Sequence, residues 1–147
     1  MPVHIRPYTE ADEPGVIALW RTVFPEAPAW NDPAADIRRK LTVQPDLFLA
    51  THDEGRIVGS TMAGFDGHRG WVYYVAVAPG WRRQGIGRAL VRTAEEGLAR
   101  LGCTKVNLQV RASNPAVVAF YENLGFVIEE RISMGKRIEH RGTVTGT

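Results

Sequence analysis

The chain has 147 residues, and its 18 Lys and Arg against 16 Asp and Glu give a formal net charge of +2. This length predicts one domain rather than two. Hydrophobic residues make up 44% and charged residues 23%, which is typical of a soluble globular protein and excludes collagen-like and disordered chains. The near-neutral charge gives little reason to expect nucleic acid as a partner.

The sequence carries no signal for membrane insertion, export or metal binding. No apolar run approaches the roughly 20 residues that a membrane span needs, and no basic-then-apolar leader opens the chain, so we expect a cytoplasmic protein without a membrane partner. Cys103 is the only cysteine, which excludes an internal disulfide and a cysteine-rich metal site. The four histidines (His4, His52, His68 and His140) lack metal-ligand spacing, so we expect no metal.

The first third of the chain predicts a strand and two helices. Alternating apolar residues over 3–6 indicate a short half-buried strand. Apolar residues at positions 16, 19, 20 and 23 predict an amphipathic helix that begins at Asp12, with Pro14 in its first turn. A second helix is predicted to begin at Asn31-Asp32-Pro33, because proline is favoured in the first helical turn.

Three strands are predicted next in the sequence. The runs 47–51 and 57–65, joined by the turn 53–56, predict an antiparallel hairpin. The run 71–77 is apolar on both faces and rich in β-branched and aromatic residues, which predicts a central strand ended by Pro79.

The longest predicted helix has one apolar face and ends at the stop signal Gly102. The residues of this face are Ile86, Leu90, Ala94, Leu98 and Leu101. A buried strand is predicted over 106–110.

The remaining chain predicts one more helix and two strands. Ser113 or Asn114 caps a helix that Pro115 opens and Gly125 ends. The runs 126–128 and 132–134 are the last strand candidates, and from Lys136 onward we expect a loose polar tail.

The most informative segment is Arg82-Arg83-Gln84-Gly85-Ile86-Gly87, between the central strand and the long helix. A helix N-terminus presents unpaired N–H groups and partial positive charge, and glycines let an anion approach the backbone. Arg88 adds a further positive charge nearby. From these residues alone, a plain strand-to-helix turn with solvated arginines is an equal alternative. Leu90 stands where the dinucleotide fingerprint has its third glycine, and the Walker pattern is missing, so other phosphate loops fit less well.

Arg82, Gly85 and Gly87 match the signature Arg/Gln-x-x-Gly-x-Gly/Ala, and the chain resembles the GNAT superfamily of acetyl-CoA-dependent N-acetyltransferases. The resemblance runs from about residue 3 to 134. Two further segments carry it beyond the loop. The family's fourth strand is similar to Val75-Ala76-Val77-Ala78-Pro79. Its fourth helix is similar to Asn114 followed by Phe120-Tyr121-Glu122-Asn123-Leu124-Gly125-Phe126. Within the superfamily, three further strings resemble the bacterial YpeA-type acetyltransferases: Trp30-Asn31-Asp32-Pro33, Leu47-Phe48-Leu49 and Asp66-Gly67-His68-Arg69-Gly70.

The resemblance implies an α/β fold in a single N-acetyltransferase domain over 1–135, followed by the tail 136–147. Its sheet would be mixed, mostly antiparallel, with six or seven strands, helices on both faces and a splay between strands four and five. Acetyl-CoA, the implied co-substrate, would lie in that splay. The implied cofactor-binding residues are Val75, Ala76 and Val77 on the strand; Arg82, Arg83, Gln84, Gly85, Ile86, Gly87 and Arg88 on the loop; and Asn114.

The reaction also needs a proton donor for the departing thiolate, and Tyr121 matches the family's tyrosine. Its unperturbed pKa of about 10 lies above that of a thiol, about 8.5. Helical spacing alone favours Tyr121 as a core residue packed beside Val117 and Val118, whereas the resemblance favours the catalytic role.

A general base is harder to assign, because Gln109 stands where relatives that acetylate the N-terminus of a ribosomal protein carry Glu. The candidates are Asp66, His68 and Tyr73 or Tyr74, although Asp66 equally caps its turn and a turn histidine is commonly plain surface. The aromatic residues Trp30, Phe65, Trp71, Tyr73 and Tyr74 either wall an acceptor pocket or belong to the core.

We therefore expect an enzyme that transfers acetyl from acetyl-CoA directly to a primary amine of a small molecule, or of a peptide or protein N-terminus. The alternative is an acyl-CoA-binding module of the same fold with little or no turnover, which Gln109 keeps open. A third reading is an interaction protein on the same scaffold, which predicts no CoA binding. A homodimer is a further expectation.

Overall fold

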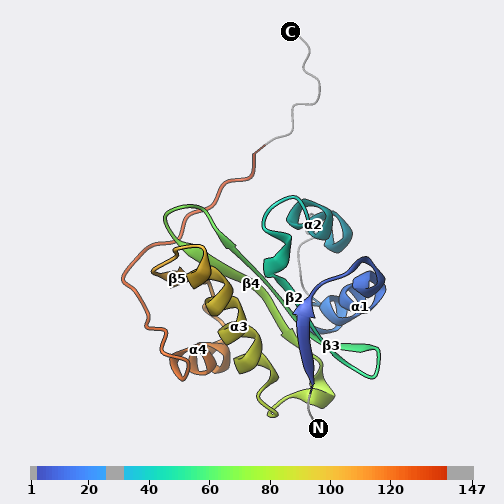
Figure 1. The fold of residues 1–147 in the computed structure, drawn as a ribbon. Coiled ribbons are helices and arrows are strands. Elements are labelled where there is room, and N and C mark those ends of the chain that lie inside the picture. Colours follow the sequence, from blue (N-terminus) through green and yellow to red (C-terminus); the bar gives the residue numbers. More distant parts are fainter. Residues whose placement is uncertain (1–2, 26–31, 139–147) are drawn as a thin grey trace, which may run out of the picture. The chain divides into compact units, whose positions relative to one another are not determined.

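The structure, a computed structural model, describes residues 3–25 and 32–138. The chain forms two compact units, one through Val110 and the other from Arg111 onward (Figure 1). The first unit holds one sheet and three α-helices, and the second holds one α-helix.

The sheet has five strands in the order β1-β2-β3-β4-β5. Their bounds are β1 His4–Pro7, β2 Phe48–Asp53, β3 Arg56–Phe65, β4 Gly70–Val77 and β5 Val106–Asn107. The first four pair antiparallel with their neighbours, whereas β5 pairs parallel with β4. The predicted hairpin is confirmed as β2 and β3, and its turn places Gly55 at φ +82°, a conformation that glycine adopts without strain.

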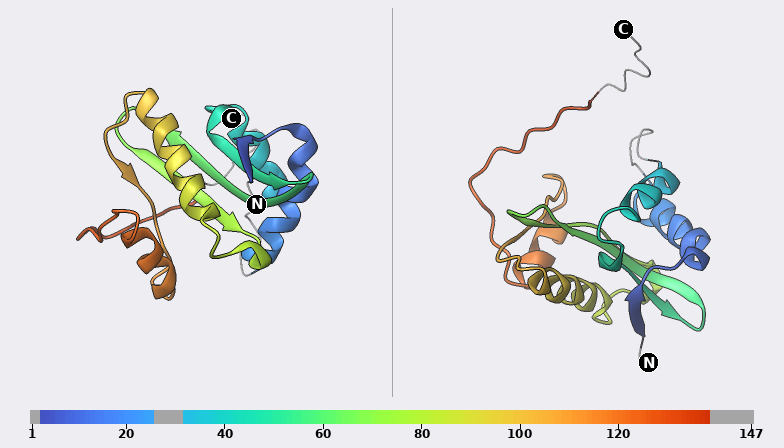
Figure 2. Two further views of the ribbon diagram at one scale, coloured as in Figure 1. Left: turned by 60° about the horizontal axis from the view of Figure 1, so that its bottom comes forward. Right: turned by 45° about the horizontal axis from the view of Figure 1, so that its top comes forward.

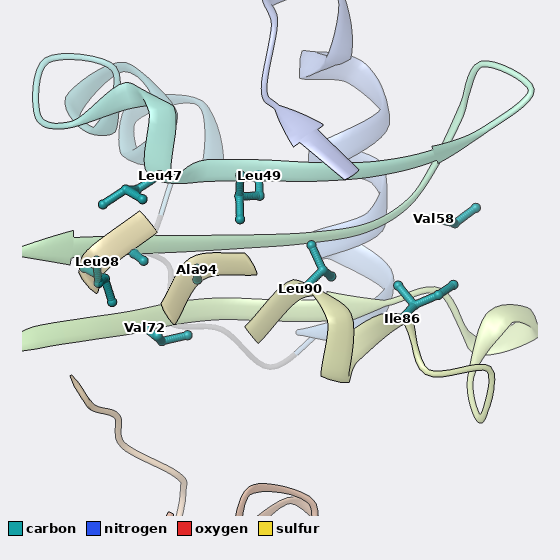
Figure 3. Packing of buried hydrophobic residues seen from close by; sticks show 9 residues of the cluster. Leu47, Leu49, Val58, Val72, Ile86, Leu90, Ala94 and Leu98 are labelled. Carbon is teal, nitrogen blue, oxygen red and sulfur yellow. The ribbon is translucent and has the colours of Figure 1, made fainter. Parts of the chain in front are cut away.

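Helices cover both faces of this sheet, as the right view of Figure 2 shows. On one face α3 (Ile86–Arg100) buries an apolar row against β2, β3 and β4 (Figure 3). The row is Ile86, Leu90, Ala94 and Leu98, packed on Leu47, Leu49, Val58 and Val72. Leu101, predicted on the same face, is 48% exposed because the helix ends at Arg100 and the chain turns away.

The other face carries α1 (Glu13–Val23) and α2 (Pro33–Lys40). The predicted start of α1 is confirmed, with Asp12 at the N-cap and Pro14 in the first turn. Helix α2 has Asp32 at its N-cap and Pro33 as its first residue. The neighbouring Asn31, named in the prediction, lies outside the described residues, as does Trp30.

An ion pair ties β1 to the short 3₁₀ turn Glu10–Asp12 before α1. The Arg6 guanidinium donates to both carboxylate oxygens of Asp12, at 2.6 Å and 2.9 Å. The Thr9 N–H donates to the same carboxylate at 2.9 Å. These donors hold the pKa of the buried Asp12 below its usual range, the Arg6 hydrogen bond being the largest cause.

The prediction of six or seven strands is wrong for the described part of the chain, which has five. The run 106–110 contributes only Val106–Asn107 to the sheet, and 126–128 and 132–134 are irregular backbone with Ile132 90% exposed. A strand forms only where a ladder partner is available, so a β-branched run does not suffice.

The second unit contains α4 (Pro115–Glu122), with Asn114 at its N-cap position and Pro115 as its first residue, as predicted. Gly125 adopts φ +96° just after the helix, and this left-handed residue ends it.

Within the described ranges, no helix is long and apolar enough to cross a membrane. Over the same ranges, no three His, Cys, Asp or Glu side chains lie together where they could hold a metal ion.

Candidate active site

The glycine loop joins β4 to α3 through the 3₁₀ turn Pro79–Trp81. Two of its residues are left-handed, Arg83 at φ +65° and Gly85 at φ +82°. Gly85 is the N-cap of α3, and a Cβ built there meets no atom of the described chain within 4 Å. Glycine is therefore favoured by backbone conformation, and the space around it stays open for a ligand.

The N-terminus of α3 has the backbone features of an anion-binding site. In an α-helix the first N–H groups have no acceptor within the helix, and here they belong to Ile86, Gly87 and Arg88. The side chain of Ile86 is buried in the core and fixes the first turn, whereas Arg83 and Arg88 are exposed. Fixed N–H donors, the positive end of the helix dipole and exposed arginines together suit a phosphate group.

The second feature of the site is an unpaired edge of β4. Strand β5 pairs only with Gly70 and Trp71, so among the described residues of the first unit no strand pairs with the remainder of β4 on that side. The Ala78 N–H donates to Val58 O at 2.9 Å, and alternate residues direct their backbone groups to opposite sides. The groups of Val75 and Val77 therefore point to the open edge, where the Arg82 Nε donates to Val77 O at 3.2 Å.

A β-bulge lies in the middle of β4. Ser60 pairs with Ala76 and Met62 pairs with Tyr73, so Thr61 alone faces Tyr74 and Val75. Tyr74 adopts φ +52°, which is rare for a bulky residue. Nothing in the local sequence predicts this bulge.

Two candidate bases lie on the exposed turn between β3 and β4. The Asp66 carboxylate accepts hydrogen bonds from the N–H groups of His68 and Arg69, both at 2.7 Å. These backbone bonds lower the pKa of Asp66, and the capping role of this residue is confirmed. A carboxylate with a lowered pKa is a poor base, and His68 is exposed on the turn.

The two adjacent tyrosines of β4 have different surroundings. The Tyr74 hydroxyl donates to Asp36 Oδ2 at 2.7 Å, and burial together with this bond raises the pKa of Tyr74 far above its usual range, so Tyr74 does not serve as a base. Tyr73 is 52% exposed and stacks with Trp71 at a ring separation of 6.5 Å. Burial of its hydroxyl, and secondly the Asp66 charge, raise the pKa of Tyr73.

The remaining predicted residues belong to the second unit or its border. Tyr121 lies on α4, and its ring packs edge-on against Phe120 at 4.9 Å and Phe126 at 5.6 Å. Burial raises the pKa of Tyr121 to about 12, so it keeps its proton at neutral pH. Asn114 is exposed at the N-cap, and Gln109 is exposed at the end of the first unit.

Comparison with known proteins shows which family the chain belongs to. Residues 14–126 match the Acetyltransferase (GNAT) family. The chain belongs to the GNAT family. Two curated relatives agree: the acetyltransferase of Pectobacterium atrosepticum is 45% identical over 92% of this chain and 96% of its own, and that of Yersinia enterocolitica is 43% identical over the same shares. This GNAT protein is accordingly an acyltransferase.

Solved structures share the fold of this GNAT protein at lower identity. AAC(6')-Iy in complex with the bisubstrate analogue CoA-S-monomethyl-acetylneamine has a TM-score of 0.79 and 17% identity, covering 94% of this chain and 99% of that chain. The NatC complex bound to Gag peptide and CoA has a TM-score of 0.76 and 22% identity, covering 90% and 89%. These likenesses confirm the predicted α/β GNAT fold.

Proposed function

We propose that this protein is an N-acetyltransferase that moves the acetyl group of acetyl-CoA directly to a primary amine. The acceptor is a small molecule, or the N-terminus of a peptide or protein. One observation carries the proposal: a short glycine loop joins the open edge of β4 to the N-terminus of α3, an arrangement that suits a long ligand with a diphosphate.

The residues of this chain divide the binding of acetyl-CoA between two elements. The backbone from Arg83 to Arg88 would hold the diphosphate, and the groups of Val75 and Val77 on the open edge would hold the pantetheine arm. Ala76 directs its backbone groups toward β3 and so spaces the two valines. Arg82 holds the loop to Val77 O, and Gln84 is exposed beside it. Asn114 of the second unit stays a predicted contact.

Bond changes in the transfer are simple. The unprotonated amine nitrogen forms a bond to the acetyl carbon, the carbon–sulfur bond breaks, and its electron pair stays on sulfur. The thiolate takes a proton, which we assign to the Tyr121 hydroxyl, and the amide nitrogen gives up one proton to solvent. N–H donors of the β4 edge stabilise the charge that develops on the carbonyl oxygen. A tyrosine that water reprotonates completes the cycle.

Two solved neighbours support the co-substrate, because AAC(6')-Iy is in complex with a CoA-linked analogue and the NatC complex is bound to CoA. They differ in acceptor: one analogue carries acetylneamine and the other complex holds a peptide. Both acceptor classes therefore belong in the test.

The test measures release of free thiol from acetyl-CoA in the presence of a panel of amines, including aminoglycosides, polyamines and short peptides with free N-termini. We expect at least one acceptor to raise thiol release well above the acceptor-free rate, with the acetylated product seen by mass spectrometry. Binding of acetyl-CoA without turnover of any acceptor would instead support the acyl-CoA-binding module.

A further inference from the structure

The bulge in β4 decides which backbone groups reach the open edge. Two hydrogen bonds mark the phase of the β3–β4 ladder on either side of it: Asp66 N to Arg69 O at 3.2 Å, and Ala78 N to Val58 O at 2.9 Å. In a regular ladder that starts from the Asp66–Arg69 pair, every second residue of β4 bonds to β3. Without a bulge, Val75 and Val77 would therefore direct their backbone groups toward β3. The extra residue reverses this, so both valines face the open edge.

Tyr74 carries the unusual backbone conformation at the bulge. A tyrosine at φ +52° is unfavourable and persists only where its surroundings enforce it. Its ring stacks on Trp20 with centroids 4.2 Å apart and planes at 10°, and Phe24 packs edge-on at 5.6 Å. The hydroxyl donates to Asp36 Oδ2 at 2.7 Å. The side chain is therefore held by α1 and α2 together.

Two more hydrogen bonds fix the strand residues that flank the bulge. The Trp20 indole N–H donates to the buried Ser60 hydroxyl at 2.8 Å, and Ser60 faces Ala76. The Thr61 hydroxyl donates to Tyr73 O at 3.1 Å. Of these contacts, only the Tyr74–Asp36 bond reaches from the bulge to α2, across 38 residues of sequence.

We propose that Tyr74 is a positioning residue: its hydrogen bond to Asp36 holds the β4 bulge in place, and thereby turns the Val75–Val77 edge toward acyl-CoA and links α2 to that edge. The inference that this edge meets acyl-CoA rests on the proposed function. The inference that Tyr74 holds the bulge does not depend on it. Tyr74 makes no contact with acyl-CoA in this account and acts only through the backbone of its own strand.

A pair of tyrosines gives the experiment a matched control. Tyr8 lies at the opposite end of the same aromatic row, stacked on Phe48 at 4.4 Å, and Phe48 in turn stacks on Trp20 at 6.0 Å. Its hydroxyl reaches Glu13 Oε1 at 3.5 Å, away from β4. Tyr8→Phe and Tyr74→Phe therefore remove the same atom from the two ends of one cluster.

The first readout is hydrogen exchange of β4 amides without ligand. We expect Tyr74→Phe and Asp36→Ala to accelerate exchange over residues 73–77, with α3 amides unchanged and Tyr8→Phe like the wild type. The second readout is calorimetric binding of acetyl-CoA, where both variants should raise Kd about tenfold, in line with a lost charge-assisted hydrogen bond. Asp36→Asn, whose amide oxygen still accepts the bond, should restore most of the affinity.

The inference is overturned if the wild type binds acetyl-CoA and Tyr74→Phe and Asp36→Ala bind it equally well, or if Tyr8→Phe weakens binding as much as they do. Failure of the wild type to bind would count against the proposed function instead. In that case the exchange data decide alone, and unchanged β4 exchange in Tyr74→Phe would overturn the positioning role.

Discussion

At the scale of one residue, burial of Tyr121 determines which proton chemistry its hydroxyl can perform. With its pKa raised to about 12, this tyrosine keeps its proton at neutral pH and can donate it to a thiolate. We expect Tyr121→Phe to lower kcat on the order of 100-fold while the Kd for acetyl-CoA stays within about twofold, because only the proton donor is removed. Steady-state rates and calorimetry measure the two quantities. Unchanged kcat at several pH values would exclude Tyr121 from the reaction.

The buried Asp12 carboxylate of the first unit accepts hydrogen bonds from Arg6 and Thr9. Its folded pKa is lowered, so its contribution to stability is present above the unfolded pKa of about 4 and is lost as pH falls through the folded value. We expect Asp12→Asn to reduce the free energy of unfolding by about 2 kcal/mol at pH 7, because Arg6 and the Thr9 N–H lose a charged partner. Urea unfolding at several pH values should show this difference shrinking below about pH 4.

The exposed Asp46 offers a control for that prediction, since Asp46→Asn should change the unfolding free energy by less than about 0.5 kcal/mol. A constant difference between wild type and Asp12→Asn from pH 7 to pH 3 would contradict the assignment to the carboxylate charge.

At the scale of elements, α3 approaches β3 closely at Gly59, where a side chain would make tighter contacts than usual. A Cβ on Gly59 would lie 3.0 Å from Ile86 Cγ2, 3.1 Å from Leu90 Cδ1 and 3.3 Å from Ala76 O. We expect Gly59→Ala to cost about 1–3 kcal/mol of stability by overpacking, and to weaken acetyl-CoA binding, because the added methyl group presses on Ile86 in the first turn of α3. Thermal unfolding and calorimetry measure the two effects.

The other end of the same helix supplies the comparison. A Cβ on Gly97 would meet Leu47 Cδ2 at 2.5 Å, so Gly97→Ala should also destabilise, but it lies three turns from the glycine loop. We expect its acetyl-CoA affinity to match the wild type. Equal losses of affinity in both variants would mean that general destabilisation, and not displacement of the loop, weakens binding.

Element starts and the loop were predictable because their signals are local. Prolines at positions 14, 33 and 115 fix their own φ in the first turn of a helix, and glycines at 55, 85 and 125 allow the positive φ that a turn or a helix end needs. Strand pairing was less predictable, because β5 and the run 126–128 depend on partners and not on their own composition. The bulge at Tyr74 contradicts the φ preference of tyrosine, and it is held by Asp36, 38 residues away, so no local pattern reveals it.

At the scale of the whole molecule, all four tyrosines have raised pKa values, chiefly because of burial. Folding favours the protonated form of a group whose pKa is raised, so at high pH the native state binds more protons than the unfolded state. Its stabilising effect is therefore complete below the unfolded pKa of about 10 and declines as pH rises through the folded value, about 12 for Tyr8 and Tyr121. We expect stability to fall above about pH 10. Titration of phenolate absorbance should give higher midpoints in the native protein than in denaturant, and a native midpoint near 10 would contradict this.

The central claim is that the turn at Gly85 binds the diphosphate of acetyl-CoA, and thermal unfolding with and without acetyl-CoA tests it most directly. At ligand about 100-fold above Kd, binding adds roughly 2.7 kcal/mol and should raise Tm on the order of 5–10 °C. Gly85→Glu should abolish this shift by placing a bulky anion in the open space at the α3 N-terminus, whereas Gly80→Glu, in the exposed 3₁₀ turn, should retain it. No shift for the folded wild type at millimolar acetyl-CoA, or an equal shift in Gly85→Glu, would contradict the account.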